Sequence, residues 1–264
     1  MLPREIADRM RERLALIRLP VQSALDAGCG TGYGTRLLRQ RYPGAHIIEL
    51  DLSESMLRHG ATRRKWVWPL TGLSARRVAV CADMQQLPIV AASVDLVWSN
   101  LALHWVEDLS AAFSQAHRVL RPGGLLMFSM LGPDTLQELR AASAGDAFRV
   151  NPHLDMHDIG DMLVACGYAD PVMDMEKITL TYGDVHALLR DLKAHGSIGL
   201  VVPQRKDLGS RRNYLCMLAR YEQFRRDDKR IPATLEVIYG HAWKPQPKLS
   251  PTGKRVIDIR SKPV

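Results

Sequence analysis

The chain has 264 residues, of which 46% are hydrophobic and 24% charged, and its formal net charge at pH 7 is +8. This length suits one α/β domain with insertions, and the composition is that of a globular protein rather than a disordered or fibrous one. No apolar stretch approaches the roughly 18–20 residues that a membrane span needs, and residues 1–5 open a charged helix rather than a signal peptide. We therefore expect a cytoplasmic protein.

The four cysteines, Cys29, Cys81, Cys166 and Cys216, lie far apart and form no C-x-x-C pair. This spacing argues against a disulfide framework and a zinc site, so we expect reduced thiols and no bound metal. The positive charge is spread over several segments, and the basic stretches lack interleaved aromatic residues. A basic protein attracts acidic partners, but this distribution predicts neither a nucleic-acid nor a membrane partner.

Strands and helices are predicted to alternate through the first 130 residues. In chain order we expect a helix at residues 3–18, a strand at 23–26, a helix at 35–41, a strand at 46–50, a helix at 53–63, strands at 76–81 and 94–98, a helix at 108–120 that residues 121–124 stop, and a strand at 125–130. This alternation predicts a parallel sheet with helices on both faces, which binds ligands at the carboxyl ends of its strands.

Beyond Met130 the alternation loosens. Helices are expected at residues 133–142, 156–166, 184–195 and 211–226, and strands at residues 171–182 and 233–243. The sequence thus predicts an α/β, Rossmann-like fold with a mostly parallel, seven-stranded sheet and helical insertions before the last strands. The expected organisation is one domain at residues 1–244, with its core at 20–130, insertions at about 133–166 and 184–230, and a loose tail at 245–264.

A glycine-rich loop, Asp26-Ala27-Gly28-Cys29-Gly30-Thr31-Gly32, lies between the first predicted strand and the next helix. Glycines let a backbone approach a ligand closely. The spacing is not the G-x-G-x-x-G of dinucleotide-binding proteins, because Tyr33 and Thr35 stand where a third glycine would be, and no Gly-Lys-Ser/Thr follows as in a P-loop. It resembles motif I of class I methyltransferases. Their sulfonium cofactor carries no pyrophosphate, so an acid at Asp26 suits its amino-acid end.

Polar residues follow the next three strands as well. Asp51 lies 19 residues after Gly32, where a carboxylate can accept both ribose hydroxyl protons. Asp83 can accept from an adenine amino group, while Met84 covers the ring. Each residue alone could be a helix cap or a turn former, but their recurrence at four strand ends predicts one cofactor site. The predicted cofactor-binding residues are Asp26, Gly28, Gly30, Gly32, Asp51, Leu52, Asp83, Met84, Ser99 and Asn100.

Longer runs resemble a particular family. Many small-molecule methyltransferases share runs like LDxGxGTG at residues 25–32, DLSxxML at 51–57 and RVLRPGG at 118–124. Much narrower are FSMLGPDTLQEL at residues 128–139, LDMHDIGD at 154–161 and PATLEVIYGHAWK at 232–244. Together these runs are similar to the malonyl-acyl-carrier-protein O-methyltransferases of biotin synthesis (the BioC family), over nearly the whole chain to about Lys244. Family members usually carry one more helix ahead of this first residue, and residues 194–199 depart from the family pattern.

The resemblance implies S-adenosylmethionine as methyl donor and the free carboxylate of a malonyl thioester as acceptor. A carboxylate with a pKa near ~4 is already ionised at pH 7, so no general base is needed. A buried carboxylate does need a cation or a hydrogen-bond donor. The candidates for this catalytic role are Arg149 first and His104 second, followed by His153 and His157.

The partner that the resemblance implies is the acidic acyl-carrier protein. Residues 184–230 hold eleven Lys or Arg against six Asp or Glu, in helices that precede the last predicted strand. We expect Arg211, Arg212, Arg225 and Arg226 to dock the carrier protein. A merely solvated basic face is the alternative.

Two other interpretations stay open at this stage. Residues 103–106 also resemble the mitochondrial complex I assembly factor that modifies an arginine, whereas Pro133-Asp134 favours the malonyl branch. The chain could also bind its cofactor, or nucleic acid, without catalysis; nucleic-acid binding would be strongly salt-dependent. The sequence does not determine whether malonyl is carried by the carrier protein or by coenzyme A, nor the oligomeric state.

Overall fold

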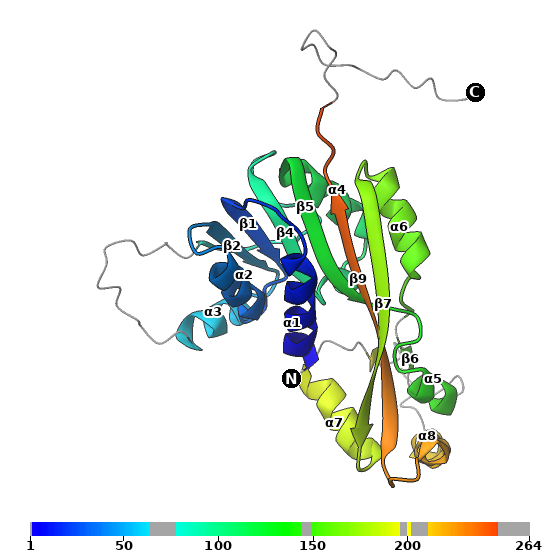
Figure 1. Ribbon diagram of the computed structural model, residues 1–264. Helices are drawn as coiled ribbons and strands as arrows, with labels where there is room; N and C mark the ends of the chain where they lie inside the picture. Colours follow the sequence, from blue (N-terminus) through cyan, green and yellow to red (C-terminus); the bar gives the residue numbers. More distant parts are fainter. Residues whose placement is uncertain are drawn as a thin grey trace, which may run out of the picture.

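A seven-stranded sheet forms the centre of the structure, a computed structural model that describes residues 2–63, 78–143, 149–150, 152–195, 200–201 and 211–247 (Figure 1). The strand order is β3-β2-β1-β4-β5-β9-β7. The strands are β1 (Ser23–Ala27), β2 (His46–Asp51), β3 (Val78–Cys81), β4 (Val94–Asn100), β5 (Leu120–Leu131), β7 (Ala169–Tyr182) and β9 (Ile231–Trp243). The first five are parallel, and β9 is antiparallel to both its neighbours. The predicted mostly parallel, seven-stranded α/β sheet is confirmed.

Helices cover both faces of this sheet. They are α1 (Leu2–Ala15), α2 (Tyr33–Arg41), α3 (Glu54–Arg63), α4 (Leu109–Val119), α5 (Gln137–Ser143), α6 (Met156–Ala165), α7 (Val185–His195) and α8 (Arg211–Tyr221). One apolar core takes side chains from α1, α2, α5, α7 and α8, and a second core takes them from α4 and α6. Successive side chains of a strand point to opposite faces. In β5, Leu125 and Met127 therefore lie in the first core, and Leu126 and Phe128 in the second.

The last two strands extend past the end of β5. Leu131, the last residue of β5, pairs with Val237, so residues 231–236 of β9 continue beyond the carboxyl edge of the parallel strands, paired only with β7. In Figure 1 this extension is flanked by α7 and α8, with α5 next to α8. A small second sheet joins β6 (Arg149–Val150) to β8 (Leu200–Val201). The inserted helices therefore lie at the edge of the sheet where ligands of such folds bind.

The prediction that a helix begins at residue 133 is wrong, since α5 begins at Gln137. Backbone N–H groups of the preceding turn are already bonded to β9: Gly132 donates to the carbonyl of Glu236 at 2.9 Å, and Leu136 donates to that of Thr234 at 2.6 Å. Because these N–H groups donate to β9, the turn does not take up the helical conformation predicted for it.

Two further predicted boundaries differ from the structure by five residues, and the first helix ends at Ala15 rather than at residue 18. β5 begins at Leu120, so residues 121–124 end α4 but belong to a strand, and the N–H of Gly123 donates to Lys244 at 2.8 Å. α8 ends at Tyr221 rather than at 226 and is followed by a 3₁₀ turn, Glu222–Phe224. Residues 76–77, 196–199 and 248–264, on which other predictions fell, lie outside the described residues. None of the described helices is long and apolar enough to cross a membrane.

Candidate active site

The glycine loop after β1 is held against the end of β2 by backbone hydrogen bonds. The N–H groups of Gly28 and Cys29 both donate to the carbonyl of Leu50, at 2.8 and 2.9 Å. The N–H of Gly30 donates to Oδ2 of Asp51 at 2.7 Å. Gly28 (φ 75°), Gly30 (φ 52°) and Gly32 (φ 81°) all have the left-handed backbone that other residues rarely adopt. The glycines therefore fix the shape of the loop, and Gly32 caps α2.

A cavity of about 390 Å³, called cavity A here, lies beside this loop at the ends of β1, β2 and β3. Its lining includes Gly28, Asp51, Leu52, Asp83, Met84 and Trp105. Oδ1 of Asp51 accepts from the N–H of Ser53 at 2.8 Å, and Oδ1 of Asp83 accepts from that of Gln85 at 2.8 Å. Leu52 is 73% exposed and Trp105 47% exposed, although both are large and apolar. Cavity A thus combines two fixed carboxylates with uncovered apolar side chains, which suits a flat ligand that carries hydroxyl and amino groups.

A second cavity of about 230 Å³, cavity B, shares Gly28 with cavity A. Its lining includes Pro3, Arg4, Asp26, Gly28, Tyr33 and Asn100. Asp26 is 1% exposed, and burial raises the pKa of its carboxyl to about 7, although the hydroxyl of Thr35 donates to Oδ2 at 2.7 Å. A cationic ligand group would favour the ionised form of this carboxyl.

The two residues predicted at the end of β4 have different surroundings. Asn100 lines cavity B, while its amide Nδ2 donates to the carbonyl of Pro3 at 3.0 Å and its Oδ1 accepts from the hydroxyl of Ser129 at 3.0 Å. Ser99 is 1% exposed and lines neither cavity A nor cavity B. Gly30 and Gly32 also lie outside both linings, so their contribution to the site is the shape of the loop.

A third cavity of about 390 Å³, cavity C, lies on the other side of the short helix η1 (Leu103–Trp105) and shares Val106 with cavity A. Its lining includes Leu103, His104, Val106, Met130, His153 and Met162. The rings of His104 and His153 meet edge to face with centroids 5.7 Å apart. Burial, with the positive charge of Arg140, lowers the pKa of His153 to about 4. His153 is therefore a neutral hydrogen-bonding group at pH 7.

The other two residues predicted to hold the acceptor carboxylate, His157 and Arg149, are not among the described lining residues of cavity C. His157 is mostly exposed, and its Nδ1 lies 2.6 Å from Oδ1 of Asp155. Arg149 lies in β6, but its side chain is outside what the structure describes.

Sequence reasoning did not single out Arg4 or Tyr33 as site residues, and placed Trp105 only in the run shared with other families. Trp105 lies shortly after the end of β4, and this position after a strand end could have indicated that it belongs to the site. Arg4 reaches cavity B because α1 packs across α2 and the sheet, which no local sequence pattern indicates.

Comparison with known proteins supports the class of fold. Residues 25–128 match the model of a family described as "Methyltransferase domain". The YcgJ protein of Bacillus subtilis superposes with a TM-score of 0.63 at 14% identity, covering 92% of this chain and 99% of that one. A phosphoethanolamine N-methyltransferase of Haemonchus contortus, solved with S-adenosylhomocysteine, has a TM-score of 0.52 at 16% identity and covers 91% of this chain and 52% of that one.

The fold and the matched domain define a Rossmann-like methyltransferase. The malonyl-[acyl-carrier protein] O-methyltransferase of Gallionella capsiferriformans is 50% identical over 258 residues, which cover 97% of this chain and 88% of that protein. The chain therefore belongs to the malonyl-[acyl-carrier protein] O-methyltransferase family.

Proposed function

We propose that this enzyme transfers a methyl group from S-adenosylmethionine to the free carboxylate of a malonyl thioester carried by acyl-carrier protein, giving the methyl ester that starts pimeloyl and biotin synthesis. The observation that carries the proposal is the 50% identity, over 97% of the chain, to a relative named for this reaction. The three adjoining cavities at the carboxyl edge of the sheet support it, because they offer room for a donor and an acceptor side by side.

The donor fits cavities A and B together. Asp51 would accept from the ribose hydroxyls, Asp83 from the adenine amino group, and Met84 and Leu52 would cover the adenine ring. In cavity B, Asp26 would pair with the ammonium group of the amino-acid end. The linings of the two cavities share Gly28, where a Cβ atom would lie 2.2 Å from Cβ of Ala102, so any side chain at this position would clash beside the proposed cofactor site. None of these proposed contacts requires a metal ion.

The acceptor would enter through cavity C. A carboxylate oxygen of the acceptor would attack the methyl carbon of S-adenosylmethionine while the bond from that carbon to sulfur breaks. The products would be a neutral methyl ester and the thioether S-adenosylhomocysteine, and no proton would have to be removed. The cofactor supplies the electrophilic methyl group, and the protein contributes orientation and the exclusion of water.

We assign the acceptor carboxylate to His104 and His153, with Arg149 as the candidate cation. His153 is neutral at pH 7 and can donate a hydrogen bond without a full charge. Glu107 and Asp108 also line cavity C, and their negative charges would repel a carboxylate, so binding of the acceptor would depend on the two histidines and on Arg149.

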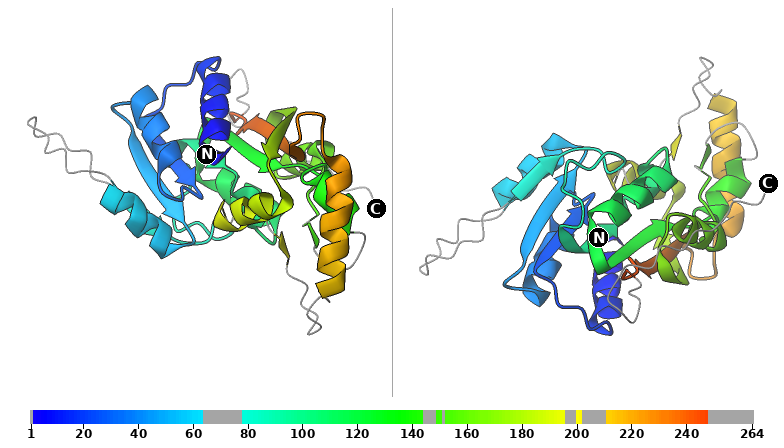
Figure 2. Two further views of the ribbon diagram at one scale, coloured as in Figure 1. Left: turned by 90° about the horizontal axis from the view of Figure 1, so that it is seen from below. Right: turned by 90° about the horizontal axis from the view of Figure 1, so that it is seen from above.

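The carrier protein is assigned to the exposed arginines at the start of α8 and in the segment that follows this helix. Figure 2 shows α8 at one end of the molecule and α3 at the other. Arg225 is already engaged, since it pairs with Glu222 and donates to the carbonyls of Gly183 and Lys229. Arg211, Arg212 and Arg226 are exposed, and they remain as the docking residues.

The test is transfer of labelled methyl from S-adenosylmethionine to malonyl-carrier protein, with malonyl-coenzyme A and unloaded carrier protein in parallel. The proposal requires a base-labile ester on the malonyl-carrier protein and its loss in Asp51→Ala. Label on a protein side chain, or cofactor binding with no transfer to either malonyl thioester, would contradict it.

The carrier assignment has its own test. The double substitution Arg211→Glu, Arg212→Glu should raise the KM for malonyl-carrier protein severalfold and leave the KM for S-adenosylmethionine unchanged. Arg58→Glu, on α3 at the far end of the molecule, is the matched charge reversal. An equal effect of both changes would rule out docking on α8.

A further inference from the structure

Arg4 is the only arginine in the described lining of cavity B, and it comes from the first turn of α1. The same cavity holds the buried carboxyl of Asp26. Cavity B thus presents one acidic and one basic side chain to the same small space. An amino-acid group carries an ammonium and a carboxylate on the same carbon, so an acidic and a basic side chain facing one small space can bind both groups.

Arg4 also differs from the other arginines of α1 in its partners. Each of the others has a carboxylate partner: Arg9 pairs with Glu5 and Glu176, Arg11 with Asp8, and Arg13 with Asp174. No carboxylate in the described part of the chain pairs with Arg4. Its guanidinium instead lies 5.4 Å from the ring centroid of Tyr33, a contact that leaves its N–H groups available.

We propose that Arg4 binds the carboxylate of the cofactor's amino-acid end, opposite the ammonium that Asp26 binds. This inference rests on the proposed function, since it places S-adenosylmethionine in cavities A and B. The guanidinium can donate two parallel hydrogen bonds to a carboxylate. The start of a 14-residue helix adds a partial positive charge at the same place.

Neighbouring contacts fix where Arg4 lies. The carbonyl of Pro3 accepts from Nδ2 of Asn100, which ties the start of α1 to the end of β4. The hydroxyl of Tyr33 donates to Oδ2 of Asp8 at 2.7 Å, which holds the ring beside Arg4. The position of Arg4 is therefore set by contacts to both α2 and the sheet.

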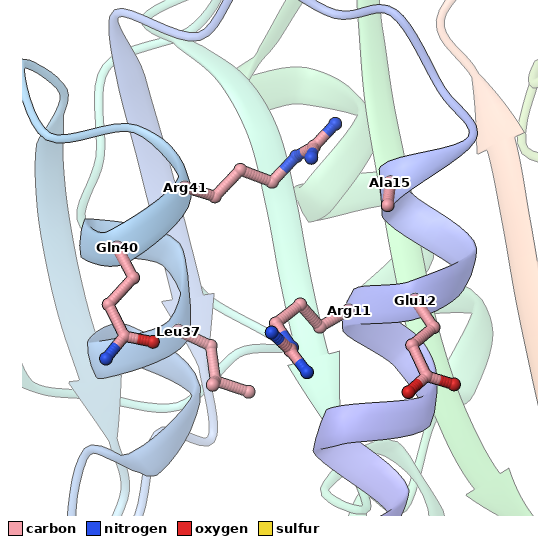
Figure 3. Close-up of a pocket in the computed structure, with 6 residues that line it drawn as sticks. All are labelled: Arg11, Glu12, Ala15, Leu37, Gln40 and Arg41. Atoms are coloured by element: carbon pink, nitrogen blue, oxygen red, sulfur yellow. The ribbon is translucent and has the colours of Figure 1, made fainter.

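The same helix supplies a control. Figure 3 shows a separate cleft between α1 and α2, with Arg11 and Glu12 on one side and Arg41 on the other. Arg11 is exposed like Arg4 but does not line cavity A or B. Replacing Arg11 removes the same charge from the same helix without touching the proposed carboxylate site.

The experiment is calorimetric binding of S-adenosylhomocysteine and of its decarboxylated analogue to wild type, Arg4→Gln, Arg4→Lys and Arg11→Gln. Arg4→Gln should weaken S-adenosylhomocysteine about tenfold or more but leave the decarboxylated analogue unchanged. Arg4→Lys should recover part of the affinity, and Arg11→Gln should behave as wild type.

Equal weakening of both ligands by Arg4→Gln, or no weakening of either, would overturn the assignment while leaving the proposed function intact. Failure of the wild-type protein to bind S-adenosylhomocysteine at all would overturn the proposed function together with the inference. A melting temperature for each variant excludes misfolding as the cause.

Discussion

The side-chain amide of Asn100 donates a hydrogen bond to the carbonyl oxygen of Pro3 at 3.0 Å, across 97 residues of sequence. This bond joins the end of β4 to the start of α1, and both residues line cavity B. The hydroxyl of Ser129 holds the other end of the amide. A residue that the sequence suggested as a cofactor contact thus also holds the start of the helix that contributes Pro3 and Arg4 to the lining of the cavity.

Replacing Asn100 should therefore loosen the start of α1. We expect Asn100→Ala to cost about 1 kcal/mol of unfolding free energy and to weaken S-adenosylhomocysteine severalfold. The matched control is Arg13→Leu, which removes an ion pair with Asp174 and the contact of the guanidinium over the Tyr239 ring at 3.8 Å. It should cost a similar free energy, measured by urea unfolding, without changing ligand affinity. If both variants lose ligand affinity equally, the link between Asn100 and cavity B is wrong.

Gly28 is expected to tolerate no side chain. Its φ is 75°, and a Cβ atom would lie 2.2 Å from that of Ala102. Gly28→Ala should lower the melting temperature and abolish measurable binding of S-adenosylhomocysteine, because the loop must move where cavities A and B meet. Gly44→Ala is the control, since a Cβ there would meet nothing within 4 Å. Retained binding in Gly28→Ala would refute the role given to this loop.

Asp51 is expected to matter more for binding than for folding. Each of its oxygens accepts one backbone N–H, from Gly30 and Ser53. An amide at this position keeps one acceptor and turns an NH₂ toward the other N–H, so Asp51→Asn should weaken S-adenosylhomocysteine by about tenfold to a hundredfold. Glu54→Gln, an exposed change on the neighbouring helix α3, should have no effect in the same titration. Comparable losses in both variants would contradict a specific role for Asp51.

The carboxyl of Asp26 predicts opposite pH effects on stability and on binding. Burial raises its pKa to about 7, whereas an unfolded Asp has a pKa near ~3.9. The folded state therefore binds more protons between these values, and its stability falls as the pH rises from about 4 to 7. Asp26→Asn should raise the melting temperature more at pH 8 than at pH 5.

Binding of an ammonium-bearing ligand needs the ionised carboxyl and should follow the opposite trend. Wild-type affinity for S-adenosylhomocysteine should increase between pH 6 and pH 7.5, while Asp26→Asn should bind weakly with little pH dependence. Calorimetry at these pH values measures the effect. Parallel pH profiles in the two proteins would show that Asp26 does not pair with the ammonium group.

The alternation of elements and the residues at strand ends could be predicted because both depend on local patterns. Strand periodicity placed Asp51 at the end of β2 and Asp83 shortly after β3, and parallel strands have their carboxyl ends on one edge of the sheet. The boundary of α5 could not be predicted, because Gly132 and Leu136 bond to β9, about 100 residues later. The β6–β8 pair was missed because two-residue strands carry no periodicity.

The sequence by itself determined the class of fold, the glycine loop and the carboxylates of cavity A, since these follow from spacing along neighbouring segments. Only the tertiary structure decided that Arg4 lies with Asp26 in cavity B and that His104 contacts His153 in cavity C. It also decided that Arg225 pairs with Glu222 and is therefore not left to bind a partner. Each of these pairings depends on how helices pack on the sheet, or on how a chain folds back at a turn. Such packing is set by the burial of whole apolar faces rather than by any short run of residues.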